Sequence, residues 1–397
     1  MYKIKHNSLF ILLILFVITI VYLFSGFFQF FIGIPNTLYT LIVTIIIYLI
    51  IAFDILIRKK LIINNSILVF IGLGLFIVIS GIVNGSHLLK ILLYLNFSYL
   101  PLSLIYLTEI CKSRKLSIKK WVSYFFHFIV LIQLPIIIIQ KYGYYFLISL
   151  SNANQDIAKV DFTFGSFPLK ADHALGFFLI LYLLNLFFKL RSGELRRFPY
   201  FMFIYIGVTI FVMESNLTKL IFILILTYYL SLWIFSKINI FGFSIIILIV
   251  FISYNLAMSS YAIRNHVYIL TNSYNDEYVL KAVERGYAKR PHIVLYQLNH
   301  EKFKWVGNGP YDYYNILKGE FKNTIHFSQL IWFYNDLGLI GLIFGLLGFF
   351  MIIKNLNLNR ESKWLIIGIM LLYLFMTNVL GDISMLLSLL IINKRLE

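Results

Sequence analysis

Charged residues and cysteine are scarce in this sequence. Charged side chains make up 13% of the 397 residues and hydrophobic ones 60%, whereas soluble domains are on average about 25% charged. This composition excludes a soluble globular domain. The single cysteine, Cys111, excludes a disulfide framework within the chain. The first apolar segment lacks a small-residue cleavage site, so we expect it to be a transmembrane helix rather than a cleaved signal.

Motifs for metals and nucleotides are missing as well. The histidines include no H-E-x-x-H pattern. His292 and His300 are the two histidines nearest to each other in the sequence, and no carboxylate lies in register with them to complete a metal site. There is no phosphate-binding loop and no dinucleotide fingerprint. We therefore expect neither a metal nor a cofactor.

The net charge of +17 does not indicate nucleic acid. The basic residues form short clusters between apolar segments, without an amphipathic or aromatic-interleaved basic surface. Such clusters are typical of membrane topology, and the lipid bilayer is the expected partner.

Apolar segments long enough to cross a bilayer recur along the chain. The sequence therefore predicts an all-α integral membrane fold, a polytopic bundle of about 11 to 12 transmembrane helices. The predicted spans are 9–31, 38–57, 62–83, 88–110, 121–140, 171–188, 200–213, 217–235, 240–257, 327–353 and 364–380, with the short segment 383–392 as a twelfth crossing.

The distribution of Lys and Arg predicts the orientation. With a cytoplasmic N-terminus, most basic residues fall in cytoplasmic segments, whereas the short outer turns hold only Lys90 and Lys219. A twelfth crossing returns the basic C-terminus to the cytoplasm. We therefore expect a multi-pass protein of the plasma or inner membrane with both termini inside.

Two longer outer segments divide the chain into three parts. The expected parts are an N-terminal transmembrane bundle over 1–257 with an outer loop at 141–170, a large extracytoplasmic loop over 258–325, and C-terminal transmembrane helices over 326–397. Long loops are commonly functional or disordered. Aromatic and aliphatic residues occur throughout the large loop, which favours short helices over disorder.

Basic residues are numerous in the large loop. They form either a solvated surface near lipid headgroups or an anion site. Arg290 stands apart because Pro291 and a helical apolar pattern follow it, and its guanidinium fork fits a phosphate oxygen pair. The set comprises Arg264, Lys281, Arg285, Lys289, Arg290, Lys302 and Lys304.

The same loop contains the stretch VGNGPYDYYN. Gly307 and Gly309 permit backbone angles closed to other residues, and Pro310 stiffens the exit. Alone, this pattern fits a plain turn as well as a contact to a sugar or phosphate.

Polar residues mark the next predicted span. His326 opens it, as an interfacial or a catalytic residue, and Asp336 lies within it, where an ionisable group usually marks a site or a partner. Gly338 and Gly341 are predicted to form a helix-packing notch.

Other polar groups fall at the same outer level in this topology. They lie at the start of the sixth span and between the seventh and eighth spans, and their convergence with the large loop favours one outer-face site. They are Lys170, Asp172, His173, Glu214, Ser215 and Lys219.

In order and spacing these features resemble the superfamily of O-antigen polymerases and O-antigen ligases. The resemblance covers roughly the second half of the chain. It rests on FGSFP before the sixth span, the Ser-containing turn at 215–219, Arg290, then G-x-G at Gly307 and Gly309, His326, and an acid with G-x-x-G at Asp336 to Gly341. Phe327 stands where the family often has Asn after its His, and the turn at 214–219 reads ESNLTK where the family often has Ser-Arg.

The resemblance implies a membrane glycosyltransferase of the GT-C type. Its donor would be an oligosaccharide on undecaprenyl diphosphate, extended at the outer face without a metal. Arg290 would stabilise the diphosphate, helped by Lys219, Lys170 and Arg285, and His326 would act on the acceptor hydroxyl.

The remaining predicted site residues are assigned to substrate binding. Gly307 and Gly309 would shape the site, Tyr311 would stack on a sugar, and Asp336 would lie beside it. A chain-length regulator protein is a further implied partner. Two alternatives stay open, a ligase that transfers finished glycan to lipid A core or another acceptor, and a flippase for lipid-linked oligosaccharide.

Overall fold

The computed structural model is built from helices. It describes residues 2–116, 119–153, 157, 159, 162–169, 172–195, 199–235, 244, 247–248, 251, 255, 261–272, 275–285, 290–300, 302–313, 328–356 and 358–392, and every regular element in these ranges is helical.

The N-terminal half supplies ten helical elements, one of which is a π-helical turn. They are α1 (Tyr2–Thr19), the π-helical turn η1 (Ile20–Phe24), α2 (Ser25–Phe31), α3 (Asn36–Arg58), α4 (Asn65–Val83), α5 (Leu88–Tyr94), α6 (Asn96–Ser113), α7 (Lys119–Tyr142), α8 (Tyr144–Ser149) and α9 (Asp172–Arg191).

The remaining helices lie in the second half. They are α10 (Tyr200–Val212), α11 (Asn216–Phe235), α13 (Tyr261–Asn272), α14 (Asp276–Glu284), α15 (Arg290–His300), α17 (Gln329–Lys354), α18 (Arg360–Met376) and α19 (Ile383–Ile392).

Seven helical segments among the described residues are long and apolar enough to cross a membrane, which confirms the polytopic membrane class. They are Asn7–Phe31, Asn36–Arg58, Asn65–Val83, Leu88–Ser113, Trp121–Tyr142, Asp172–Arg191 and Gln329–Lys354. The apolar helices Tyr200–Val212 and Asn216–Ser231 are shorter. Helix α19 has only 10 residues, and the predicted span 240–257 lies largely outside the described residues. The total of 11 to 12 crossings stays a prediction.

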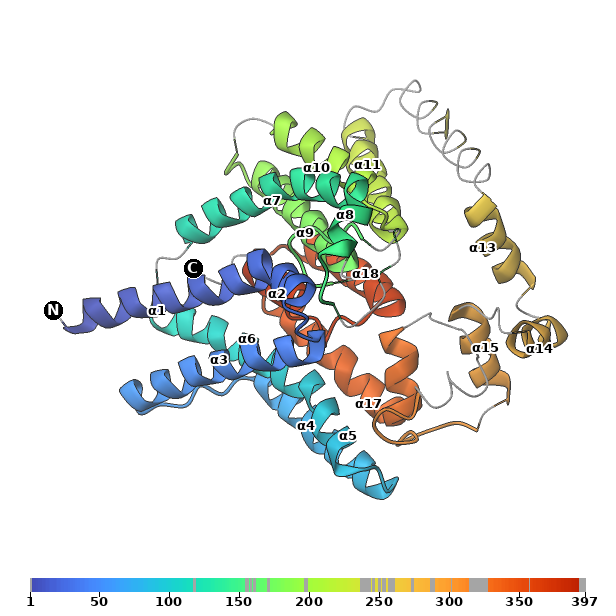
Figure 1. The fold of residues 1–397 in the computed structure, drawn as a ribbon, viewed down its shortest axis with the longest axis horizontal. Coiled ribbons are helices and arrows are strands. Elements are labelled where there is room, and N and C mark those ends of the chain that lie inside the picture. The colour runs from blue at the N-terminus through green and yellow to red at the C-terminus, as the bar shows by residue number, and fades with distance from the viewer. Residues whose placement is uncertain are drawn as a thin grey trace.

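One apolar core joins the two ends of the chain. It runs from Phe10 in α1 to Leu390 in α19. Helix α17 packs against α4 and α18, and α19 packs against α9 and α6. Figure 1 shows α17 beside α4, with α13, α14 and α15 grouped on the side of the bundle away from the N-terminus. The C-terminal helices are therefore part of the same bundle as the N-terminal ones.

The FGSFP segment enters this bundle as a buried loop. Two amides of α7 bind its backbone. Gln140 accepts from Gly165 N and donates to Gly165 O, both at 2.8 Å. Gln133 accepts from Ser166 N at 3.1 Å and donates to the Ser166 hydroxyl at 2.9 Å. These side chains replace the water that an irregular backbone would need in an apolar interior.

The same loop explains the π-helical turn in the first span. A π-helical turn shifts the helical hydrogen-bond register and leaves a carbonyl free for another donor. The Ser166 hydroxyl donates to Tyr22 O at 2.5 Å, and Gly26 N donates to Ser166 O at 3.2 Å. A Cβ on Gly26 would lie 2.6 Å from Phe167 O, so this close approach requires glycine.

Candidate functional site

Helix α17 is broken at Gly338. This glycine has φ 67° and ψ −167°, so the helix stops at Leu337 and starts again at Leu339. A break leaves carbonyls at the end of the first half and N–H groups at the start of the second half without helical partners. In an apolar bundle such groups need partners from elsewhere in the protein.

The loop before α17 supplies acceptors for the second half. Leu339 N donates to Lys304 O at 2.9 Å, and Ile340 N donates to Trp305 O at 3.2 Å. The backbone of the loop therefore caps the start of the restarted helix.

The same loop also supplies donors for the first half. Asn308 N donates to Asn335 O and Gly309 N to Asp336 O, each at 2.9 Å. The Ser80 hydroxyl of α4 contacts Val306 O at 3.1 Å and Asp336 O at 3.3 Å. We call the loop 302–313 with the α17 break the clamp, because four backbone hydrogen bonds join them.

The Asp336 carboxylate fixes the end of the clamp. Its two oxygens accept from Tyr311 N at 2.9 Å and from Tyr313 N at 2.7 Å. Asn335 Nδ2 donates to it at 3.0 Å, and the side chain is fully buried. Asp336 therefore organises the loop backbone, and direct contact with a substrate stays a prediction.

Aromatic residues surround the clamp in two environments. Tyr311, at φ 64°, packs edge-on against Tyr94 with the ring centroids 5.2 Å apart. Phe303 and Trp305 form an edge-on pair at 5.1 Å and are 58% and 61% exposed. Trp305 is thus better placed than Tyr311 for stacking on an external ring.

A second polar group of residues links α9, α11 and α18. His173 Nδ1 lies 3.0 Å from the Ser215 hydroxyl, which lies 2.9 Å from the Thr218 hydroxyl. Thr218 Oγ1 is in turn 3.0 Å from the Tyr373 hydroxyl. Ser215, Thr218 and Tyr373 are buried, whereas His173 is half-buried. We call these four residues the hydroxyl chain.

The hydroxyl chain is anchored to the buried FGSFP loop. Glu214 N donates to the Thr163 hydroxyl at 3.0 Å. The Glu214 carboxylate pairs with Lys141 Nζ at 2.6 Å, and Lys141 also donates to Val212 O at 3.1 Å. Ser215 is therefore held in place by contacts of the preceding residue, Glu214, with the buried loop and with α7.

The other predicted site residues fall into three groups. Gly307 and Gly309 lie within the clamp. Lys219 is half-buried in the first turn of α11 and has no ion pair with a described residue. Arg285 is exposed after α14. Arg290 begins α15, but its side chain, Lys170 and His326 lie outside what the structure describes. The convergence of Arg290 with His326 therefore stays a prediction.

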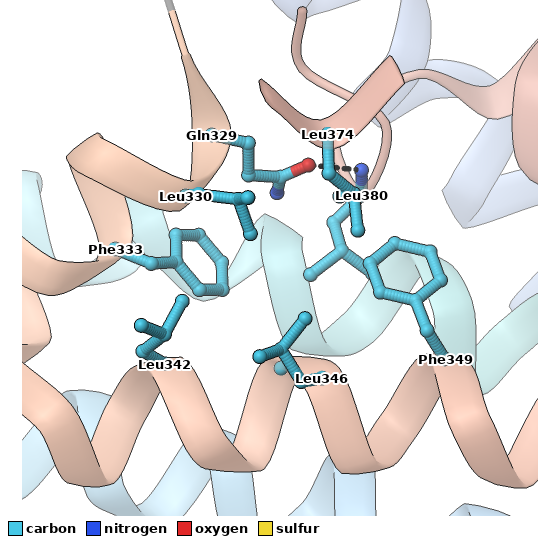
Figure 2. A pocket seen from close by; sticks show the side chains of 9 residues that line it. Gln329, Leu330, Phe333, Leu342, Leu346, Phe349, Leu374 and Leu380 are labelled. Carbon is cyan, nitrogen blue, oxygen red and sulfur yellow. Dashed lines mark hydrogen bonds between the residues drawn. The ribbon is translucent and has the colours of Figure 1, made fainter. Parts of the chain in front are cut away.

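An apolar pocket lies between the two halves of α17. Gln329 and Phe333 line it from the first half, and Leu342 and Phe349 from the second. Figure 2 shows the Gln329 amide at its edge, with its oxygen toward the Leu380 nitrogen. That oxygen accepts from Val379 N at 2.8 Å and from Leu380 N at 3.0 Å. The pocket walls offer hydrocarbon contacts.

Metal-ligating side chains do not cluster in the described part of the chain. No group of three or more His, Cys, Asp or Glu residues there is arranged to hold a metal ion.

Sequence reasoning missed several residues of these structures. Gln133 and Gln140 are seven residues apart, so they share a helix face, and two amides within an apolar span were a usable signal. Thr218 and Tyr373 carry no such signal, because their partners come from other helices.

Comparisons with known proteins add no family assignment. No family model, no curated protein and no solved structure matches this chain.

Proposed function

We propose that this protein is an integral-membrane glycosyltransferase that polymerises oligosaccharide repeat units at the outer membrane face. The donor is an oligosaccharide on undecaprenyl diphosphate, and the acceptor is a sugar hydroxyl of the growing glycan. The proposal rests on the seven apolar helices, on the resemblance in motif order, and on the clamp.

The clamp is the observation that carries the proposal. It fixes residues 302–313, which follow α15, against the broken helix α17. In the sequence, Arg290 begins α15 and His326 precedes α17 by three residues. Broken helices in membrane proteins occur where backbone is buried in protein or lines a site. A non-glycine residue in the left-handed region, Tyr311 at φ 64°, and a buried carboxylate are a costly arrangement for a simple connection.

The reaction forms one C–O bond and breaks another. The acceptor oxygen attacks the anomeric carbon, its proton passes to His326, and the bond to the diphosphate oxygen breaks with its electron pair. Negative charge then builds on the lipid diphosphate, where fixed cations lower the barrier. Arg290 supplies a positive charge at the diphosphate, with Lys219, Lys170 and Arg285 as further cations.

A glycan gel tests the proposal. A strain lacking the chain is complemented with wild type, Arg290→Ala or His326→Ala, and protein levels are matched by immunoblot. We expect polymer ladders from wild type and single repeat units from both variants. Arg264→Ala, which alters an exposed arginine of α13, and His87→Ala, which alters an exposed histidine before α5, are matched controls and should keep the ladder.

The same gel separates the alternatives. Long lipid-linked chains that never reach their acceptor would indicate a ligase. Loss of all surface glycan, with lipid-linked units retained inside, would indicate a flippase. Ladders from both Arg290→Ala and His326→Ala would remove the proposed site.

A further inference from the structure

His173 is the one member of the hydroxyl chain that reaches the surface. Its Nδ1 atom faces Ser215 at 3.0 Å, and its Nε2 atom has no hydrogen-bond partner among the described residues. His173 is half-buried, whereas its three partners are buried. A neutral imidazole carries its proton on only one nitrogen. The hydrogen bonds of the hydroxyl chain determine which nitrogen this is.

Tyr373 sets the direction of the hydrogen bonds. Its ring is fully buried against Phe177, with the centroids 4.9 Å apart. Its hydroxyl has one hydrogen-bond partner in the described part of the molecule, Thr218 at 3.0 Å. A buried phenol without an acceptor for its proton is unfavourable, so Tyr373 donates to Thr218.

The donor of each following hydrogen bond in the hydroxyl chain is then determined. Thr218 accepts from Tyr373 and donates to Ser215, because each hydroxyl has a single proton. Ser215 likewise donates to Nδ1 of His173. Nδ1 is thereby an acceptor, and the proton of the neutral ring lies on Nε2.

Close packing of α9 on α11 keeps Thr218 in this position. A Cβ on Gly176 would lie 1.9 Å from Thr218 Oγ1 and 2.8 Å from both Thr218 Cβ and Cγ2. Only glycine therefore leaves room for this Thr218 conformation.

We infer that Tyr373, Thr218 and Ser215 are positioning residues that hold His173 as a hydrogen-bond donor through Nε2, and that this donor binds a phosphate oxygen of the substrate. An N–H donor suits an ionised diphosphate, which only accepts hydrogen bonds. It does not suit the attacking hydroxyl, which must give up a proton. The ligand assignment rests on the proposed function, whereas the tautomer does not.

Nitrogen NMR on the full chain in nanodiscs tests the tautomer. The protein is labelled with ¹⁵N-histidine, and the difference spectrum against His173→Gln identifies the His173 signals. We expect Nε2 to be the protonated nitrogen. A wild-type spectrum with the proton on Nδ1 of His173 would overturn the inference.

Variants then test the positioning residues. Tyr373→Phe and Thr218→Val should raise the fraction of His173 that carries its proton on Nδ1. Thr218→Ser should give the same fraction as the wild type. Gly176→Ala should act like Thr218→Val, whereas Gly368→Ala in α18, where a Cβ has open space, should have no effect. An unchanged Nδ1–H fraction of His173 in both Tyr373→Phe and Thr218→Val would contradict the role of the hydroxyl chain.

Ligand titrations test the phosphate contact. Inorganic pyrophosphate, or a polyprenyl phosphate in the nanodisc, should shift the His173 Nε2 signal, and methyl glucoside should not. A shift with the polyprenyl phosphate alone would identify the lipid as the source. No shift with either phosphate, or a shift with the glucoside alone, would overturn the contact. A phosphate shift in a protein that fails the glycan-gel test would remove the polymerase and leave this inference standing.

Discussion

Gly307 and Gly338 pack backbone against backbone at the break in α17. A Cβ on Gly307 would lie 2.4 Å from Asp336 C and O, and one on Gly338 would lie 2.4 Å from Trp305 C and O. Both glycines have positive φ, +80° and +67°. The loop and the broken helix therefore fit together only because neither position carries a side chain.

Alanine at either glycine should destabilise the protein. Gly307→Ala and Gly338→Ala each combine a left-handed backbone, which costs about 1–2 kcal/mol, with a clash against backbone. We expect both variants to lower the thermal midpoint and to abolish glycan polymer. Gly85→Ala is the matched control, since Gly85 has φ +62° and nothing within 4 Å of its Cβ position. A midpoint loss no greater than that of Gly85→Ala would show that the close packing is unimportant.

Asp336→Asn should loosen the clamp while conserving volume. An amide can replace only one of the two oxygens that accept from Tyr311 N and Tyr313 N. Loss of a hydrogen bond to a charged group costs about 1.5–3 kcal/mol. Hydrogen–deuterium exchange over 302–313 should therefore increase. Asp312→Asn is the control, because its retained oxygen can still accept from Asn308 Nδ2; equal exchange in the two variants would argue against Asp336 as the anchor.

Gln140→Leu should release the FGSFP loop. It leaves both N and O of Gly165 without the partners that Gln140 provides, at about 1–3 kcal/mol for each buried group. Gln140→Glu keeps the acceptor and loses the donor, so its stability should fall between wild type and Gln140→Leu. Thermal unfolding in detergent measures this order, and a Leu variant as stable as wild type would refute it.

An ion pair between the end of α9 and the first turn of α18 should make the stability of the protein fall at low pH. Arg191 Nη1 lies 2.7 Å from Glu361 Oε2, and this hydrogen bond, with a second from Tyr228, lowers the pKa of Glu361 below its usual value. A lowered carboxyl pKa gives stability that is present above the unfolded-state value of about 4.3 and is lost as the pH falls through the folded-state value.

Glu361→Gln removes this dependence. Because the pair is 53% and 40% exposed, it contributes less than about 1 kcal/mol. Thermal midpoints should differ between wild type and Glu361→Gln at pH 7 and converge at lower pH. Parallel pH curves for the two proteins would contradict this account.

Hydrophobic patterning predicted the membrane class because apolar length alone determines whether a helix can span a bilayer. It also predicted short helices within 258–325, where α13, α14 and α15 lie. Exact spans were less predictable, since α10 and α19 are only 13 and 10 residues long.

The clamp was only partly visible in the sequence. The residue types of Gly307, Gly309 and Asp336 indicate a site in the sequence. The G-x-x-G spacing predicts a packing notch at Gly338, which instead breaks the helix. The break depends on Lys304 and Trp305, whose carbonyls replace the helical partners. Backbone pairing between distant segments leaves no periodic pattern, so the sequence contained no sign of it.

The hydroxyl chain was less visible still. The predicted topology puts the polar residues His173 and Ser215 at one level, whereas Tyr373 is one aromatic residue among many in an apolar span. Its role comes from the close approach of α9, α11 and α18, which only the folded bundle defines.

The most direct test of the central claim is glycan extension by purified protein in nanodiscs. The substrate is a repeat unit on undecaprenyl diphosphate, and the products are separated on a gel with and without protein. We predict a ladder of lipid-linked oligomers from wild type and none from Arg290→Ala or His326→Ala. Single repeat units that remain unextended by correctly folded wild-type protein would contradict the proposed polymerase.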